Sequence, residues 1–247
     1  MRGYQKLSNL LYLPLVMKAI GMPTVSAPTI RMYGGVHDDP GSRQRFLEEL
    51  AKRETVPHFV AVEWEQSVFT QLSAWRSRIK EGLSSHWGFL TLEDCHELSC
   101  ALAWEGDAST ERFPDTDRLW LETGFQERYL QQQARDSDTV PDKVLENQAN
   151  CLLKFMTEIP PPEPTSKKEL IDRVWRERWS KAWSMPGDFD RDARWATMIF
   201  ERSAGLRDGW IAVVGGWQHA NPQEDHQRLL GLLRARGFGV NSVCLGP

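Results

Sequence analysis

The chain has 247 residues, of which 40% are hydrophobic and 26% charged, a composition typical of a globular protein. Its formal net charge is −4 and its pI is near 5.9. Because nucleic-acid binding depends on an excess of Lys and Arg to neutralise phosphates, these values argue against a nucleic-acid-binding function.

The N-terminal run "KLSNLLYLPLVMKAIG", followed by "VSA", loosely resembles a signal peptide. Its uncharged part, residues 7–17, is too short to span a bilayer, and Lys18 interrupts it. We therefore expect an N-terminal helix that packs on the core, with export as the alternative.

The cysteines are Cys95, Cys100, Cys151 and Cys244. None of them forms a CxxC pair, which argues against a zinc ribbon or a thioredoxin-like site. Reduced thiols and a cytoplasmic location are therefore expected.

From residue 29 onward, strand patterns alternate with helix patterns. The segment "TIRMY", residues 29–33, predicts a buried strand that ends at two glycines, and Pro40 marks the start of the next helix. The following predicted elements are strand 58–64, helix 66–80, a helix through "TLEDCHELSCALAWEGD" capped by Gly106, and strand 116–122.

The middle of the chain is predicted to be mostly helical, with helices at 125–157 and 166–184 around the proline-rich turn "IPPPEPTS". Helix 188–203, strand "WIAVVGG", helix 222–236 and a final strand "FGVNSVCL" follow. Strand–helix–strand flanks around a helical middle predict one α/β domain over residues 1–247. Its core halves are predicted at 28–105 and 188–247, with a helical insertion at 106–187.

Two histidines follow paired glycines at similar positions in the two flanks. His37 and His219 each have a proline three residues later and a leucine ten residues later. Each unit would place its histidine at the carboxyl end of a strand, the edge at which ligands bind in open α/β sheets. The sequence thus predicts a sheet built from two related strand–GxxH–helix–strand halves, with both imidazoles in one crevice.

Acidic residues accompany these histidines. Glu63 ends strand 58–64, on the face opposite Val60 and Val62, and Glu105 and Asp107 lie at the end of a predicted helix. Two imidazoles with one or two carboxylates suit zinc, manganese or cobalt, and without a metal they could activate water. A single GxxH motif is more often only a turn, and Glu63 alone could be a capping or surface carboxylate. It is the matched pair of motifs that favours a site.

Other patterns have ordinary structural explanations. Trp175, Trp179 and Trp183 recur every four residues, a stripe typical of core packing and less often of a pocket wall or lid. The segment "DRDAR", residues 190–194, is typical of a solvated helix face. The remaining histidines, expected to be structural or exposed, are His58, His86, His96 and His226.

The two GxxH motifs resemble those of the TraB/Tiki superfamily, which also includes erythromycin esterase-like proteins, ChaN-like proteins and a domain of certain bacterial toxins. "HFVAVEW" resembles the second strand of that family with its terminal glutamate, "LAWEGD" a later acidic segment, and "DRDARWATMI" its arginine-bearing helix. The resemblance covers most of the chain but is strong only at both ends, and Trp217 and Gln218 are bulkier than the motif favours. It implies an α/β fold of two related halves with the active site between the histidines.

Together these features predict a hydrolase of an ester or amide (peptide) bond that depends on a divalent metal, namely manganese, cobalt or zinc. His37 and Glu63 would bind the metal or activate water, and His219 would be the second ligand or the general acid. Arg191 would stabilise the developing oxyanion, and Glu105 would orient a histidine or complete the metal shell.

Two other functions stay open at this point. One is a protein that binds haem, a metal or a small acidic ligand without turnover, with tryptophans as apolar walls. The other is a toxin or effector domain. The expected partner of the hydrolase is a small-molecule or peptide substrate.

Overall fold

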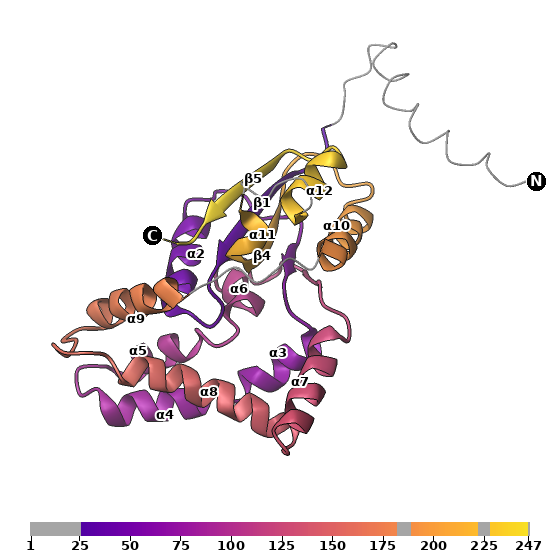
Figure 1. Cartoon of the computed structure of the whole chain (residues 1–247). Coiled ribbons are helices and arrows are strands. Elements are labelled where there is room, and N and C mark those ends of the chain that lie inside the picture. Colours follow the sequence, from indigo (N-terminus) through magenta and orange to yellow (C-terminus); the bar gives the residue numbers. More distant parts are fainter. Residues whose placement is uncertain (1–25, 182–188, 222–227, 247) are drawn as a thin grey trace, which may run out of the picture.

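A parallel sheet of five strands, in the order β3-β2-β4-β1-β5, forms the centre of the computed structural model, which describes residues 26–181, 189–221 and 228–246 (Figure 1). The strands are β1 (Thr29–Gly35), β2 (Val60–Val62), β3 (Arg118–Trp120), β4 (Trp210–Gly216) and β5 (Val240–Cys244). Every strand coincides with a segment predicted from the sequence, and β1 continues through both of its glycines. The prediction of an α/β fold is confirmed.

β1 and β4 are neighbours at the centre of the sheet, so segments far apart in the sequence lie side by side. Gly34 pairs with Gly215, and Gly35 pairs with Gly216. A Cβ on Gly34 would lie 2.7 Å from the Cα of Trp217, the first residue of the short helix α11 (Trp217–Ala220). The missing side chain therefore lets α11 pack directly over the end of β1.

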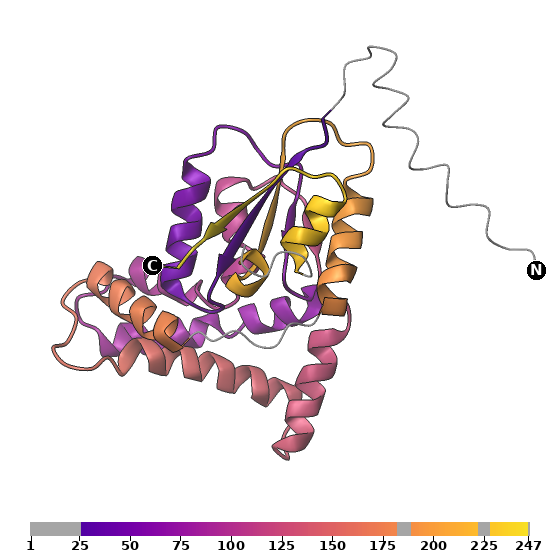
Figure 2. The ribbon, with the colours of Figure 1, turned by 45° about the horizontal axis from the view of Figure 1, so that its top comes forward.

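Helices cover both faces of this sheet (Figures 1 and 2). One face packs against α10 (Phe189–Arg202) and α12 (Leu229–Ala235), and the other packs against α2 (Pro40–Ala51) and α6 (Ala108–Arg112). Ala61 lies in the first of these two cores, whereas Val60 and Val62 lie in the second. The predicted alternation along β2 is thus confirmed.

Further helices form a separate layer next to the carboxyl edge of the sheet, below it in Figure 2. They pack around an apolar core of their own, which includes Leu72, Leu83, Leu98, Leu152 and Leu170. These helices are α3 (Gln66–Ser73), α4 (Arg76–His86), α5 (Leu92–Ser99), α7 (Phe125–Asp136), α8 (Pro141–Thr157) and α9 (Lys167–Lys181). The layer contains α3, α4 and α5 from the predicted N-terminal core half and α7, α8 and α9 from the predicted insertion, residues 106–187. The insertion also contributes β3 to the sheet.

Two helices predicted as continuous are each broken in two. Helix 66–80 is interrupted at Ala74 and Trp75, whose N–H groups bond to carbonyl groups three residues earlier, so that α4 leaves in a new direction. Helix 125–157 is interrupted before Pro141, because proline disfavours helical geometry in the residue that precedes it and has no N–H for a continuing helix.

The helix predicted through residues 91–107 ends at Ser99, and Gly106 does not cap it. Instead the chain turns at Ala103, whose φ of 54° lies in the left-handed region, and forms the 3₁₀ turn η1 (Trp104–Gly106). The Asp38 carboxylate accepts a hydrogen bond from the Ala103 N–H at 2.7 Å, and this bond holds the break in place. The turn matters because it carries Glu105.

Parts of several predictions lie outside the described residues: the helix over residues 7–17, Trp183, Pro222 and His226. All four cysteines are free thiols. Among the described helices, none is both long and apolar enough to cross a membrane.

Replacing Gly34 by alanine tests the close approach of α11 to β1. We expect the free energy of unfolding to fall by about 1–3 kcal/mol, because the new methyl group meets backbone atoms of Trp217 that cannot move aside cheaply. Urea denaturation measures the change. Gly88→Ala is the matched control, since a Cβ at Gly88 would have nothing within 4 Å, and equal stability of the two variants would contradict the packing argument.

Candidate active site

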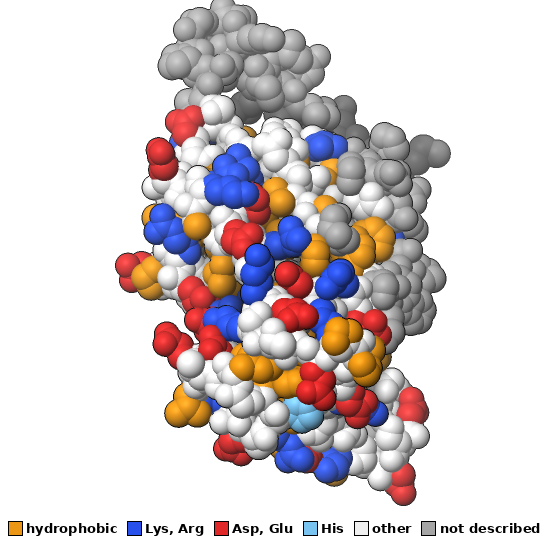
Figure 3. Space-filling model, turned by 90° about the vertical axis from the view of Figure 1, so that its left-hand side faces the viewer, with side chains coloured by type: hydrophobic (Ala, Val, Ile, Leu, Met, Phe, Trp, Pro, Cys, Tyr) orange, Lys and Arg blue, Asp and Glu red, His pale blue; other side chains and the backbone are white. Residues whose placement is uncertain are grey.

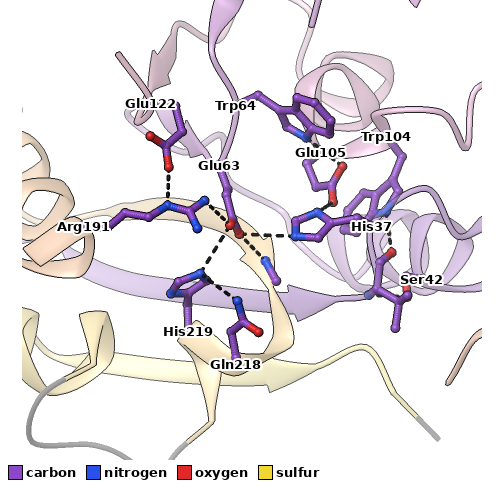
Figure 4. A network of polar contacts seen from close by, with 12 residues as sticks. His37, Ser42, Glu63, Trp64, Trp104, Glu105, Glu122, Arg191, Gln218 and His219 are labelled. Atoms are coloured by element: carbon purple, nitrogen blue, oxygen red, sulfur yellow. Dashed lines mark hydrogen bonds and ion pairs between the residues drawn. The ribbon is translucent and has the colours of Figure 1, made fainter. Parts of the chain in front are cut away.

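The five residues predicted for the site converge at the carboxyl edge of the sheet (Figure 4). Each comes from a different element. His37 lies in the turn after β1, Glu63 directly after β2, Glu105 in η1, Arg191 in α10 and His219 in α11.

Glu63 lies between the two imidazoles. Its Oε1 is 3.3 Å from Nε2 of His219, and its Oε2 is 3.7 Å from Nε2 of His37. Arg191 donates a hydrogen bond to Oε1 at 2.5 Å, and the Gly216 N–H donates one to Oε2 at 2.5 Å. Burial alone would raise the pKa of this carboxyl, but the positive charges of His219, Arg191 and His37 outweigh it and hold the pKa well below its usual range.

The paired glycines of β4 make room for this carboxylate. A Cβ on Gly215 would lie 2.6 Å from Oε2 of Glu63, and a Cβ on Gly216 would lie 3.1 Å from Nε2 of His37. A side chain at Gly215 would therefore displace the charged centre of the site.

His37 is oriented by Glu105. Its Nδ1 lies 2.5 Å from Oε1 of Glu105, whose other oxygen accepts a hydrogen bond from Trp64 Nε1 at 3.0 Å. Desolvation alone would lower the pKa of His37, but the carboxylates of Glu105 and Glu63 raise it to about 9. The His37 side chain is 42% exposed, so its imidazole can reach a ligand.

His219 has the same kind of arrangement in a buried setting, with 3% of its side chain exposed. Its Nδ1 lies 2.7 Å from Oδ1 of Asp192, and the Trp195 ring packs against it at a centroid distance of 4.8 Å. Burial alone would lower the pKa of His219, but Glu63 and Asp192 raise it to about 9. His219 does not line the cavity described below, but it contacts Glu63, which does.

Arg191 bridges two carboxylates. Besides Glu63 it bonds through Nε to Glu122, whose carboxyl has a pKa raised by burial. Its guanidinium also lies over the Trp195 ring at 4.4 Å. These contacts fix Arg191 in place at the wall of the cavity.

Sequence reasoning missed Glu122, Asp192 and Trp64. Glu122 closes the predicted strand 116–122 in the same way that Glu63 closes its own strand, so the signal was available. Asp192 lies in the segment predicted to be a solvated face, yet it is fully buried. Asp107, considered as an additional oxygen donor, forms an ion pair with Arg76 instead.

A cavity of about 570 Å³ opens above this network, within the range of small-molecule sites. His37, Glu63 and Arg191 are among the residues that line it. The rest of its wall combines aromatic rings, amides and one further cation: Trp64, Phe125, Tyr129, Phe155, Trp217, Gln126, Gln148, Gln218 and Arg178. The bulky residues of the second GxxH motif, Trp217 and Gln218, are thus part of the cavity wall.

A second cavity, of about 600 Å³, lies between α2, α5, α6 and α9 on the side of the molecule shown in Figure 3. Acidic and basic side chains are interspersed on this side, and Arg43 pairs with Glu111 while Lys167 pairs with Asp94 and Glu97. Among the described residues that line this second cavity there is no histidine, whereas His37 lines the first.

Glu63, His37 and His219, as they are arranged here, do not fit a divalent metal well. Carboxylate-paired Nδ1 atoms often support imidazoles that ligate a metal, but here both Nε2 atoms face a carboxylate already bonded to Arg191 and the Gly216 N–H. A cation at Glu63 would lie beside the guanidinium and be repelled by it. Within residues 26–181, 189–221 and 228–246, no group of three or more His, Cys, Asp or Glu side chains is arranged to hold a metal ion.

No protein-family model matches this chain, and neither the curated proteins nor the solved structures include one that is recognisably similar to it.

The raised pKa values predict how stability depends on pH. The pKa of His219 is about 9 in the fold against an ordinary value of 6.5, so its stabilising charge is fully present below pH 6.5 and lost as the pH rises through 9. We expect the free energy of unfolding to fall over this window, with an upper bound of about 3 kcal/mol from His219. His219→Gln should flatten the slope, as measured by urea denaturation at several pH values.

Replacing the exposed His96 by glutamine provides the control for this experiment, because that side chain lies outside the network. The slope should match that of the unchanged protein. A free energy of unfolding that stays constant or rises between pH 6.5 and 9 would show that the imidazolium form of His219 does not stabilise the fold.

Proposed function

We propose that this protein is a hydrolase that adds water to an ester or amide bond of a small-molecule or peptide substrate bound in the 570 Å³ cavity. One observation carries the proposal. His37 reaches this cavity with Nδ1 fixed by Glu105 and Nε2 facing the ionised Glu63 at 3.7 Å. A partly exposed imidazole that is oriented by a buried carboxylate is a group suited to proton transfer.

The distance between His37 and Glu63 suits a shared water molecule. At 3.7 Å, Nε2 and Oε2 are too far apart for a direct hydrogen bond but close enough for one water to contact both. In the proposed reaction this water attacks the carbonyl carbon of the substrate and passes a proton to Nε2. That proton then moves to the leaving oxygen or nitrogen as its bond to the carbonyl carbon breaks.

The remaining predicted residues have supporting roles in this proposal. Glu105 stabilises the imidazolium that forms on His37. His219 is a positioning residue, because it contacts Glu63 and not the cavity. Arg191 lines the cavity, its bonds to Glu63 and Glu122 hold its guanidinium in place, and we assign to it the stabilisation of the developing oxyanion.

We also infer that β1 and β4 head two related halves, in line with the resemblance of the GxxH motifs to the TraB/Tiki superfamily. The support is the register in which Gly34 pairs with Gly215 and Gly35 with Gly216 at the sheet centre. The halves differ after the glycines, since His37 lies in a turn and His219 in a helix. The two GxxH motifs are therefore offset by one residue in the sheet.

Binding of a small ligand without turnover is the second candidate, favoured by the aromatic wall formed by Trp64, Phe155 and Trp217. Haem would be one such ligand. A Soret band in the purified protein together with no hydrolysis of any ester or amide would support this candidate over the hydrolase.

Replacing His37 by alanine should abolish most of the hydrolysis. A panel of p-nitrophenyl esters and anilides identifies a hydrolysed substrate, and kcat/KM for it should fall by about 10²–10⁴-fold because the proton acceptor is lost. His96→Ala is the matched control and should keep full activity. Full activity in His37→Ala on the same substrate would contradict the assignment.

The pH profile gives a second readout of the same assignment. Because the pKa of His37 is about 9, its neutral, proton-accepting form increases with pH, so kcat/KM should rise about tenfold per pH unit and level off above pH 9. A rate that is constant between pH 6 and 9 would exclude His37 as the proton acceptor.

Elemental analysis tests the metal that the sequence predicts. If water is activated directly, the purified protein should contain no stoichiometric manganese, cobalt or zinc and should keep its activity after dialysis against a chelator. If the protein contains a stoichiometric metal that is absent from the His37→Ala/His219→Ala double variant, both histidines are metal ligands. Direct activation of water by His37 and Glu63 would then be wrong.

A further inference from the structure

We propose that the substrate carries an anionic group, a carboxylate or a phosphate, that binds to Arg178 beside His37. The inference rests on the proposed function, because it takes the cavity next to His37 as the place of the substrate. It adds a specificity-determining residue and a chemical class of substrate to that function.

Arg178 is fixed at the cavity wall by two contacts. From α9, its Nη2 donates a hydrogen bond to the main-chain oxygen of His37 at 2.5 Å. Its guanidinium carbon lies 5.0 Å from the centroid of the Phe155 ring, which belongs to α8 and lines the same cavity. An arginine held in this way loses little side-chain freedom when it binds a ligand.

In the part of the chain that the structure describes, the other cations at the site form ion pairs with carboxylates, whereas Arg178 forms none. Arg191 bonds to Glu63 and Glu122, and His37 pairs with Glu105. Among the described residues, no carboxylate oxygen lies within the 4.0 Å ion-pair distance of Arg178.

The hydrogen-bonding capacity of Arg178 is also incompletely used. Its Nε is buried and has no hydrogen-bond partner in the described part of the chain. Burial raises the pKa of the Asp39 carboxyl to about 6, and the charge of Arg178 opposes this only in part. The two side chains form no ion pair within 4.0 Å. A half-buried guanidinium that forms no ion pair is stabilised when an anion binds it.

The chemistry of the wall indicates what accompanies the anion. The guanidinium fork of arginine matches the two oxygens of a carboxylate or a phosphate. The Phe155 ring lies next to the guanidinium. Trp217, which packs against Trp179 at a centroid distance of 6.0 Å, lines the same cavity. The class of ligand is therefore a small amphiphilic acid with an apolar or aromatic part.

The same geometry places the anion close to the bond to be broken. Arg178 bonds to the main-chain oxygen of His37, and the imidazole of the same residue faces Glu63. An anion on Arg178 therefore lies close to the bond that His37 would help to break. A substrate of this class carries its charge only a few bonds away from the hydrolysed carbonyl group.

A binding experiment without turnover tests this inference. Benzoate, phenyl phosphate and neutral benzamide are titrated into the full chain by calorimetry, with tryptophan fluorescence as a second signal because Trp64 and Trp217 line the cavity. We expect at least one anion to bind about tenfold or more tightly than benzamide, the value of one charged hydrogen bond. Which anion binds more tightly distinguishes a carboxylate from a phosphate.

Three variants separate charge from structure. Arg178→Gln should remove the preference for the anion, and Arg178→Lys, which keeps the charge but not the fork, should retain part of it. Arg176→Gln is the matched control, since Arg176 lies on the same helix, is exposed and does not line the cavity, and this variant should keep the full preference. Urea denaturation confirms that each variant is folded.

Three outcomes would overturn the role of Arg178: equal binding of the three compounds, an anion preference that persists in Arg178→Gln, or no saturable binding to the folded protein. None of these outcomes contradicts the proposed hydrolase function if His37→Ala loses activity. Conversely, an Arg178-dependent anion preference in a protein that hydrolyses nothing would refute the hydrolase and leave the anion site in place.

Discussion

Burial of the Glu63 carboxylate at the end of β2 is the interaction on which the site depends. An isolated charge so well shielded from water would be strongly destabilising. Here the cost is offset by Arg191, by the Gly216 N–H and by the two imidazolium groups. These partners come from three separate segments: the turn after β1, α10, and the end of β4 with α11. The buried carboxylate is therefore fully compensated only when all three have folded around it.

This requirement explains several local features that would otherwise be unfavourable. Gly215 has no side chain because a Cβ would meet the carboxylate. Asp38 and Ala103 both have φ values in the left-handed region, 52° and 54°, and the hydrogen bond between them joins the turn after His37 to the turn that carries Glu105. Unfavourable backbone geometry of this kind is retained when the surrounding contacts enforce it, and it is frequent at functional sites.

The sequence predicted the elements of the sheet well because their signals are local. Short strand-like segments predicted all five strands, and the ends of two of these strands led to the prediction of Glu63 and His37 as site residues. What it could not predict depends on partners distant in the chain. The break at Ala103 is held by Asp38, and the burial of Asp192 is stabilised by His219 and by the Leu229 N–H. In each case the local pattern, a continuing helix or a solvated face, was overruled by a contact between segments.

The charged network and the helical part of the cavity wall belong to different parts of this fold. The charged groups that would act on a bond lie at the ends of β1, β2 and β4 and on α10 and α11, in the packed part of the sheet. Part of the cavity wall comes from the helical layer, with Tyr129 on α7, Phe155 on α8 and Arg178 on α9. Substitutions in that layer can alter which molecule fits without disturbing the charges around Glu63, since the layer has an apolar core of its own. The two parts meet where Arg178 bonds to the main chain of His37, and there the identity of a ligand can influence the group proposed to move a proton.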